Sequence, residues 1–236
     1  MKTLIKLELK RNKIRTYLIA SLIIAITMLG FLYLFAYAPM LEPNDKDMAI
    51  FSGYNNLIPL FGVLNMAAFC VLSAVMYSKF IIEDYSGKRP ILLFSYPVSR
   101  KKIIVSKLSV VYGFTIILMV ISNLAIFMIF GITENFIHLV SENFTFSILL
   151  QAIETTLVMA FIAASIGVVA VGIGFIKKSI PTTIVSAVLI ASLMCNIAVN
   201  TTSNRILMYI FATVMIFIGI IISILLIKKV NIMEVE

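Results

Sequence analysis

The stretch LIPLFGVLNMAAFCVLSAVMYS, residues 57–78, indicates the class of fold, because it runs for 22 residues without a charged side chain. A helix of this length crosses the roughly 30 Å hydrocarbon core of a bilayer at about 1.5 Å per residue. An open strand would leave backbone N–H and C=O groups without partners in lipid. The stretch therefore predicts a transmembrane helix.

Five further apolar runs of similar length predict five more spans. The six predicted spans cover residues 17–38, 57–78, 109–131, 152–174, 180–199 and 206–227. The chain of 236 residues is 61% apolar and 13% charged, whereas soluble domains are about half apolar and a quarter charged. We therefore predict an all-α integral membrane protein, a single transmembrane domain over residues 1–236.

The basic residues predict the orientation of the spans. The segments before span one, between spans two and three, between spans four and five, and after span six hold 6, 7, 2 and 2 of the 19 Lys and Arg residues. The other side holds only Lys46 and Arg205. Since cytoplasmic loops are enriched in Lys and Arg, both termini are expected in the cytoplasm. This distribution favours contact with anionic lipid headgroups over a nucleic-acid-binding surface.

Residues 1–16 predict an amphipathic helix on the cytoplasmic leaflet, because lysines recur there at helical spacing. These lysines are Lys2, Lys6, Lys10 and Lys13. A basic anchor without fixed structure is the alternative, since Glu8, Arg11 and Arg15 interrupt the apolar face. On the outer side, residues 132–151 alternate apolar and polar side chains, which predicts either a short interfacial helix or an extension of span four.

The largest predicted cytoplasmic loop covers residues 79–107. Pro90 suits the first turn of a helix and Pro97 prevents its continuation, so a helix of about two turns is expected between them. It carries four consecutive apolar residues, Ile91, Leu92, Leu93 and Phe94. Such a run within a charged loop indicates either a docking surface for a soluble partner or insertion into the headgroup layer. In the docking case, the polar rim is formed by Glu83, Asp84, Lys88, Arg89 and Arg100.

The residues around this helix form a pattern in which an acidic residue and a glycine precede Leu-x-x-x-Pro-Val-Ser-Arg and a later lysine. Its positions are Glu83, Gly87, Leu93, Pro97, Val98, Ser99, Arg100 and Lys107. With the six spans and the basic lead-in helix, the chain resembles over its whole length the permease subunits of type-2 ABC exporters. Larger members carry a re-entrant hairpin between the last two spans, whereas residues 200–205 leave space for only a tight turn. In this respect the chain resembles the compact bacterial members that handle peptides, lantibiotics or drugs.

The resemblance implies a coupling helix within residues 83–96 that seats in a groove of an ABC ATPase subunit. It implies two such subunits, a second permease that is identical or paralogous, and a bacterial cell membrane as the location. The expected cargo is amphipathic or lipophilic, most of all antimicrobial or cytolytic peptides. The implied coupling residues are Glu83, Asp84, Gly87, Arg89, Ile91, Leu92, Leu93, Phe94, Pro97, Ser99 and Arg100.

The chain has no G-x-x-x-x-G-K-[ST] phosphate-binding loop, so ATP and Mg²⁺ are expected on the partner subunit and no enzymatic activity or cofactor in this chain. No His/Cys/carboxylate metal cluster is expected either, because His138 is the sole histidine and lies on the outer side. An ATP-independent secondary transporter or channel is the alternative function. An intramembrane enzyme is the least favoured function, because it would require an acid/base or metal constellation near its substrate and the sequence supplies none.

Four polar residues in or near the spans are candidates for the transport pathway. They are Glu154, Asn65, Asn123 and Asn196. Glu154 lies near the outer end of span four, where a carboxylate can sit at the interface, line a pathway or pair with a partner. The three asparagines form interhelical hydrogen bonds or contact the cargo.

Overall fold

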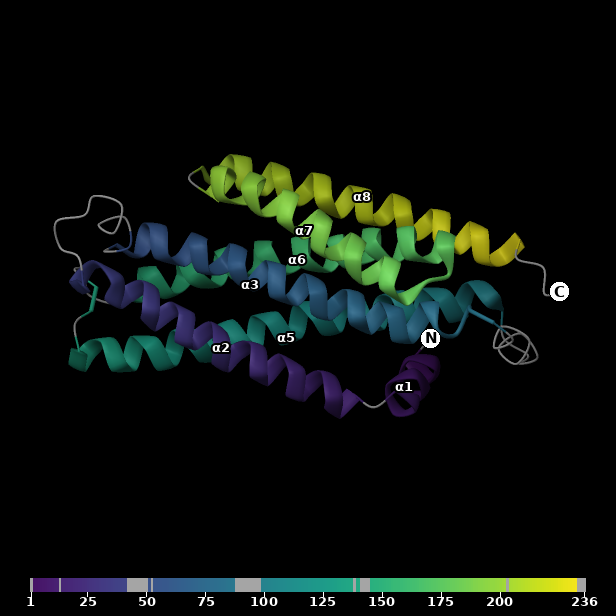
Figure 1. Cartoon of the computed structure of the whole chain (residues 1–236), viewed down its shortest axis with the longest axis horizontal. Coiled ribbons are helices and arrows are strands. Elements are labelled where there is room, and N and C mark those ends of the chain that lie inside the picture. Colours follow the sequence, from purple (N-terminus) through teal and green to yellow (C-terminus); the bar gives the residue numbers. More distant parts are fainter. Residues whose placement is uncertain are drawn as a thin grey trace.

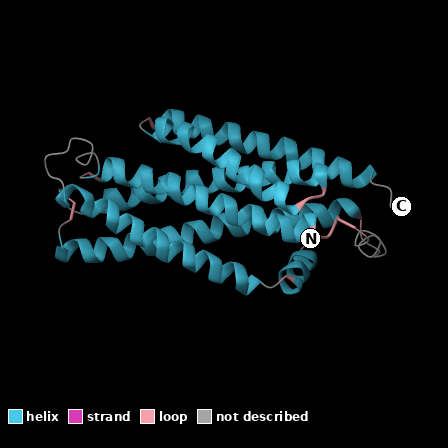
Figure 2. Ribbon diagram, in the orientation of Figure 1, coloured by secondary structure: helices cyan, strands magenta, loops and turns pink. Residues whose placement is uncertain are grey.

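The computed structural model describes residues 2–12, 14–41, 51, 53–87, 99–137, 139–140, 145–202 and 204–232. Within these ranges the protein consists of helices with short connections, and no strand occurs (Figure 2). Six of the described helices are long and apolar enough to cross a membrane. The predicted all-α fold with six spans is therefore confirmed.

A short helix precedes the six spans (Figure 1). The elements are α1 (Lys2–Arg11), α2 (Ile14–Leu41), α3 (Tyr54–Tyr77) continued by the π-helix η2 (Ser78–Ile82), α5 (Arg100–Ile137), α6 (Phe146–Lys177), α7 (Ile180–Thr202) and α8 (Arg205–Ile232). Each predicted apolar run falls inside one of these spans. The predicted lead-in helix ends earlier than expected, at Arg11, and α2 begins already at Ile14.

Helices α3 and α6 form the centre of the bundle and pack against each other. In their most apolar stretches 61% and 67% of the residues are buried, against 17–22% for α2, α7 and α8. The outer helices therefore expose large apolar side chains such as Leu189 and Phe217. In a bilayer, lipid tails or a further helix cover such side chains without a penalty.

Two glycines allow the close approach of α6 to its neighbours. A Cβ atom on Gly167 would lie 3.0 Å from the Ser73 Cβ of α3, and one on Gly174 would lie 2.8 Å from the Thr183 Cβ of α7. Small residues at helix crossings permit this packing in membranes. The small residues at these two positions of span four thus serve packing inside the subunit.

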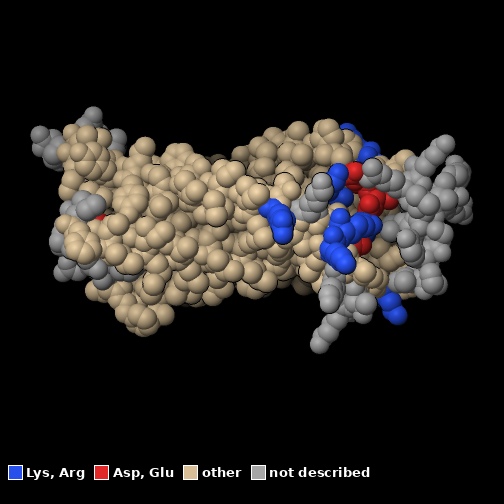
Figure 3. Space-filling model, turned by 90° about the horizontal axis from the view of Figure 1, so that it is seen from below, with Lys and Arg blue, Asp and Glu red and all other residues tan. Residues whose placement is uncertain are grey.

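Charged side chains gather near one end of the molecule (Figure 3). Helix α1, the connection between α6 and α7, and the end of α8 all lie there (Figure 1). We call this the basic end. Arg205 begins α8 at the opposite end. That the basic end faces the cytoplasm stays a prediction.

The hairpin of α7 and α8 is shorter than its neighbours at the opposite end (Figure 1). Helix α6 ends and α7 begins at the connection formed by residues 178–179, but α6 has 32 residues and α7 only 23. Their lengths are therefore roughly 48 and 34 Å at 1.5 Å per residue. The wall formed by α6 extends past the turn between α7 and α8.

Within the stretch of residues 132–151, residues 132–137 and 146–151 belong to two different spans. Helix α5 continues to Ile137, and α6 begins at Phe146. The expected extension of span four is correct for residues 146–151 and wrong for residues 132–137, which prolong span three. Phe136 and Phe146 are both strongly exposed, so these two aromatic side chains do not mark which span each part of the stretch joins.

Candidate functional site

A cluster of four charged side chains joins three separate elements at the basic end. Glu8 and Arg11 come from α1, Asp84 follows η2, and Lys107 lies in the second turn of α5. We call them the ionic cluster. The Lys107 side chain is fully buried, and its Nζ donates hydrogen bonds to Asp84, to the Phe80 carbonyl oxygen at 2.8 Å, and to Glu8 Oε2 at 3.3 Å.

Arg11 completes the cluster from its partly exposed side. Its Nη2 pairs with Asp84 and lies 3.2 Å from Glu8 Oε2. The cluster thus contains two carboxylates and two cations, so its formal charges balance. A buried ammonium group without such partners would carry a large desolvation penalty. Burial of Lys107 therefore depends on α1 being docked against the bundle.

The π-helix η2 sets the position of Asp84. It shifts the backbone pairing so that the Glu83 N–H donates to the Ser78 carbonyl oxygen at 3.0 Å, a step of five residues. Three consecutive apolar side chains, Phe80, Ile81 and Ile82, are buried there. Single π-helical turns inside α-helical spans often occur at functional sites. Here the turn directs the Phe80 carbonyl oxygen at Lys107.

Two residues just after η2 are also fixed in place. Tyr85 is buried, with its ring 5.5 Å from that of Phe175 in α6. Burial, reinforced by the negative charges of Asp84 and Glu8, raises the pKa of the Tyr85 phenol, which stays neutral at physiological pH. Gly87 has φ +60°, a left-handed conformation that favours glycine and accounts for this residue in the sequence pattern.

The structure describes five of the predicted coupling residues. Glu83 pairs with Lys79 at 2.5 Å, and Asp84 belongs to the ionic cluster. The Ser99 carbonyl oxygen accepts the first backbone hydrogen bonds of α5, which begins at Arg100. The remaining predicted coupling residues lie outside the described residues. They are Arg89, Ile91, Leu92, Leu93, Phe94 and Pro97.

Sequence reasoning did not identify the partnership of Glu8, Arg11 and Lys107. Glu8 and Arg11 counted there as interruptions of an apolar face, whereas in the structure Ile5 and Leu9 pack against the core beside them. The one available signal was Glu8 itself, the single acidic residue in a segment otherwise rich in lysine and arginine.

The three candidate asparagines occupy different surroundings. Asn65 and Asn123 are fully buried and bond each other, and the Asn123 side chain also donates to Thr156 Oγ1 at 3.1 Å. They therefore link α3, α5 and α6. Asn196 is exposed on α7, on the same face as the exposed Ser192 and Asn200. A pathway role for the three asparagines stays a prediction.

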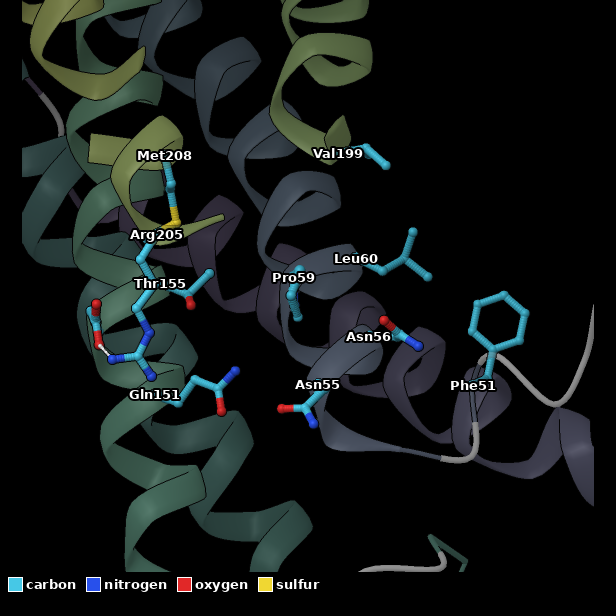
Figure 4. Close-up of a pocket in the computed structure, with 11 residues that line it drawn as sticks. Phe51, Asn55, Asn56, Pro59, Leu60, Gln151, Thr155, Val199, Arg205 and Met208 are labelled. Atoms are coloured by element: carbon cyan, nitrogen blue, oxygen red, sulfur yellow. Dashed lines mark ion pairs between the residues drawn. The ribbon is translucent and has the colours of Figure 1, made fainter. Parts of the chain in front are cut away.

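Glu154 lies at the opposite end, in the wall of a cavity of about 530 Å³ (Figure 4). Its Oε2 is 3.8 Å from Arg205 Nη1, and its Oε1 accepts a hydrogen bond from Tyr209. Both partners belong to α8. The cavity, here called the outer pocket, is bounded by the starts of α3, α6 and α8 and by the end of α7. It is lined by Phe51, Asn55, Asn56, Pro59, Leu60, Gln151, Glu154, Thr155, Val199, Arg205 and Met208.

Neither site offers an evident metal centre. Among the residues that the structure describes, no three His, Cys, Asp or Glu side chains come close enough together to hold a metal ion. The ionic cluster is a set of mutually paired groups, which suits mechanical attachment of helices. The outer pocket combines opposite charges, carboxamides and an apolar wall, which suits binding of an amphipathic ligand.

Comparison with known proteins gives two matches. Residues 4–192, from α1 into α7, match the family described as ABC-2 family transporter protein. The uncharacterized protein YcbO of Bacillus subtilis (strain 168) is 31% identical over 191 residues, which cover 81% of this chain and 82% of that protein. No solved structure matches the chain.

Proposed function

We propose that this chain, which belongs to the ABC-2 transporter family, forms one half of the membrane-spanning part of an exporter. It is thus a multi-pass membrane subunit that works with an ABC ATPase. Two separate ATPase subunits bind ATP and Mg²⁺, and a second permease completes the channel. The cargo is an amphipathic or lipophilic molecule, above all an antimicrobial or cytolytic peptide. The family match carries this proposal.

The ionic cluster supports a route by which an ATPase moves the spans. Asp84 lies at the start of the proposed coupling segment, residues 83–96, and Lys107 lies in α5, which follows that segment. Their contact ties the two ends of the loop together, and Glu8 ties both to α1. A push on the loop would therefore move η2, the start of α5 and α1 as one unit rather than bend the loop alone.

The distribution of charge supports the orientation. Lys and Arg gather at the basic end (Figure 3), where α1 and the end of α8 lie (Figure 1). Positively charged segments are retained in the cytoplasm during insertion. In the proposed arrangement both termini and the coupling loop face the cytoplasm of a bacterial cell, where an ATPase has access to ATP.

The exposed face of α7 supports a shared pathway between two permeases. Ser192, Asn196 and Asn200 recur at intervals of four residues on this face, and all three are exposed. Carboxamides that face lipid tails are unfavourable, so polar residues in spans usually face another helix or a water-filled space. We therefore assign this face of α7 to the cargo pathway at the contact with the second permease.

We expect the double substitution Leu93→Asp with Phe94→Asp to abolish retention of the ATPase and ATP-dependent export, because charged groups cannot fill an apolar groove. The tagged permease is purified from its host, and subunits with a phosphate-binding loop are quantified by mass spectrometry. The control is Phe136→Asp with Phe146→Asp, which alters two exposed phenylalanines at the opposite end and leaves ATPase retention unchanged. Normal export by the Leu93/Phe94 variant, or export driven by proton-motive force without any ATPase, would contradict the proposal.

We expect a cysteine at position 196 to react with a membrane-impermeant maleimide, because a pathway-lining residue contacts water. The test uses Asn196→Cys after replacement of Cys70 and Cys195 by Ser. The control is Ile210→Cys, which is 54% exposed on α8 at a similar distance from the turn between α7 and α8 and stays unlabelled in lipid. Equal labelling at both positions would remove the assignment of α7 to the pathway.

A further inference from the structure

The outer pocket lies at the height of the lipid headgroups. Helix α7 has 23 residues and spans about 34 Å, slightly more than the roughly 30 Å hydrocarbon core. The turn that follows it therefore reaches the headgroup layer of the leaflet opposite the basic end. Arg205 starts α8 directly after this turn, and its contact with Glu154 places that residue of α6 at the same height. Helix α6 continues beyond as a wall.

The two charges of the pocket are only loosely joined. The Arg205 side chain is 70% exposed, and its closest approach to Glu154 is 3.8 Å, at the outer limit of an ion pair. A guanidinium group has five N–H donors in a planar fork that matches phosphate. Figure 4 shows this group beside Gln151 within the cavity. Arg205 therefore has donor capacity left for a ligand.

Glu154 makes the pocket unsuited to a plain anion. Its carboxylate is 30% exposed and stands beside the same space as Arg205, so an anion bound to Arg205 would be repelled. Tyr209 donates to one carboxylate oxygen and holds the side chain in place. A ligand with a cationic group next to its anionic group fits both charges at once.

Polar and apolar groups divide the rest of the wall. Gln151 and Asn55 present carboxamides from α6 and α3 on the two sides of the cavity (Figure 4). The apolar part of the wall, on the side of the hydrocarbon core, comes from Pro59, Leu60 and Val199. The cavity of about 530 Å³ falls within the range of small-ligand sites. A ligand with a polar head and an apolar body matches this division.

We propose that the outer pocket binds the headgroup of a zwitterionic phospholipid with a primary ammonium group. The phosphate lies on Arg205, and the ammonium group, two carbons away, lies between Glu154 and the carboxamides of Gln151 and Asn55. Phosphoethanolamine carries this chemistry. The proposal concerns lipid binding alone and does not depend on the ATPase, the cargo or the direction of transport.

The test measures lipid retained by the purified full chain. The protein is exposed to equal amounts of phosphatidylethanolamine, phosphatidylcholine and phosphatidylglycerol, and bound lipids are counted by native mass spectrometry. We expect phosphatidylethanolamine to be retained about tenfold over the other two, since a hydrogen bond to a charged group is worth roughly one such factor. Soluble phosphoethanolamine at high concentration is expected to displace the bound phosphatidylethanolamine, because the pocket recognises the headgroup.

Variants identify the two charged partners. Arg205→Gln lowers the retention of phosphatidylethanolamine about tenfold, whereas Arg205→Lys keeps part of it. Glu154→Gln preserves the shape and the acceptor for Tyr209 but removes the preference over phosphatidylglycerol. The control Lys228→Gln, an exposed lysine at the basic end, changes nothing.

Two results overturn the proposal. If the three lipids are retained equally, and Arg205→Gln does not change their retention, the bound lipid is only unspecific lipid around the spans. Displacement of all bound lipid by a short peptide with a free terminal carboxylate, but not by its amidated form, assigns the pocket to a peptide instead.

Discussion

Replacing Lys107 with Met is expected to release α1 from the bundle and to destabilise the protein by about 3–5 kcal/mol, the usual effect of removing one partner from a buried ion pair. The substitution leaves Glu8 and Asp84, whose side chains are only 13% and 16% exposed, with Arg11 as their remaining cation. Thermal unfolding in lipid nanodiscs measures the loss. Protease cleavage between α1 and α2 reports the release of α1.

The matched control is Lys101→Met, which makes the same change on the same helix at an exposed position. It should leave the unfolding temperature nearly unchanged, because an exposed charge contributes little. Adding Asp84→Asn to Lys107→Met removes one of the stranded carboxylates, so the two effects should be less than additive. If Lys107→Met unfolds at the same temperature as the unaltered protein, the ionic cluster does not hold α1.

Replacing Gly174 with Ala is expected to separate α6 from α7 and to destabilise their hairpin by about 1–3 kcal/mol, as overpacking of a tight core does. The added Cβ would lie 3.1 Å from the Thr183 Cα, so backbone rather than a flexible side chain must move. The connection has little freedom to adapt, because Lys178 is left-handed and the Ser179 N–H bonds the Gly174 carbonyl oxygen at 3.2 Å. Size-exclusion chromatography after heating measures the fraction that survives.

Gly30→Ala serves as the control for this substitution. A Cβ at Gly30 meets nothing within 4 Å, so the change should be neutral or stabilise α2 by up to about 1 kcal/mol through higher helix propensity. Thr183→Gly combined with Gly174→Ala removes the side chain nearest the new methyl group and should recover part of the loss. If both alanine variants survive heating equally, the contact of α6 with α7 is not limited by Gly174.

The asparagines show how far local sequence leads. Polarity alone marked Asn65, Asn123 and Asn196 as one group, since each interrupts an apolar run. Packing separates them, because Asn65 and Asn123 meet between α3 and α5 while Asn196 lies on an exposed face of α7. No spacing within a single run carries that information, because it depends on how each helix is rotated relative to its neighbours.

The number and the approximate limits of the spans follow from the sequence alone, which also predicts their orientation. Lipid acts as a uniform apolar solvent, so the hydropathy of each run decides whether that run is inserted, with little reference to the rest of the chain. The ionic cluster and the outer pocket, in contrast, depend on how the helices pack in three dimensions. Lys107 and Glu8 are 99 positions apart, and Glu154 and Tyr209 are 55 apart. Such groups meet only after the helices have packed, because the rotation and axial offset of each helix, set by contacts such as those at Gly167 and Gly174, place the charges opposite one another.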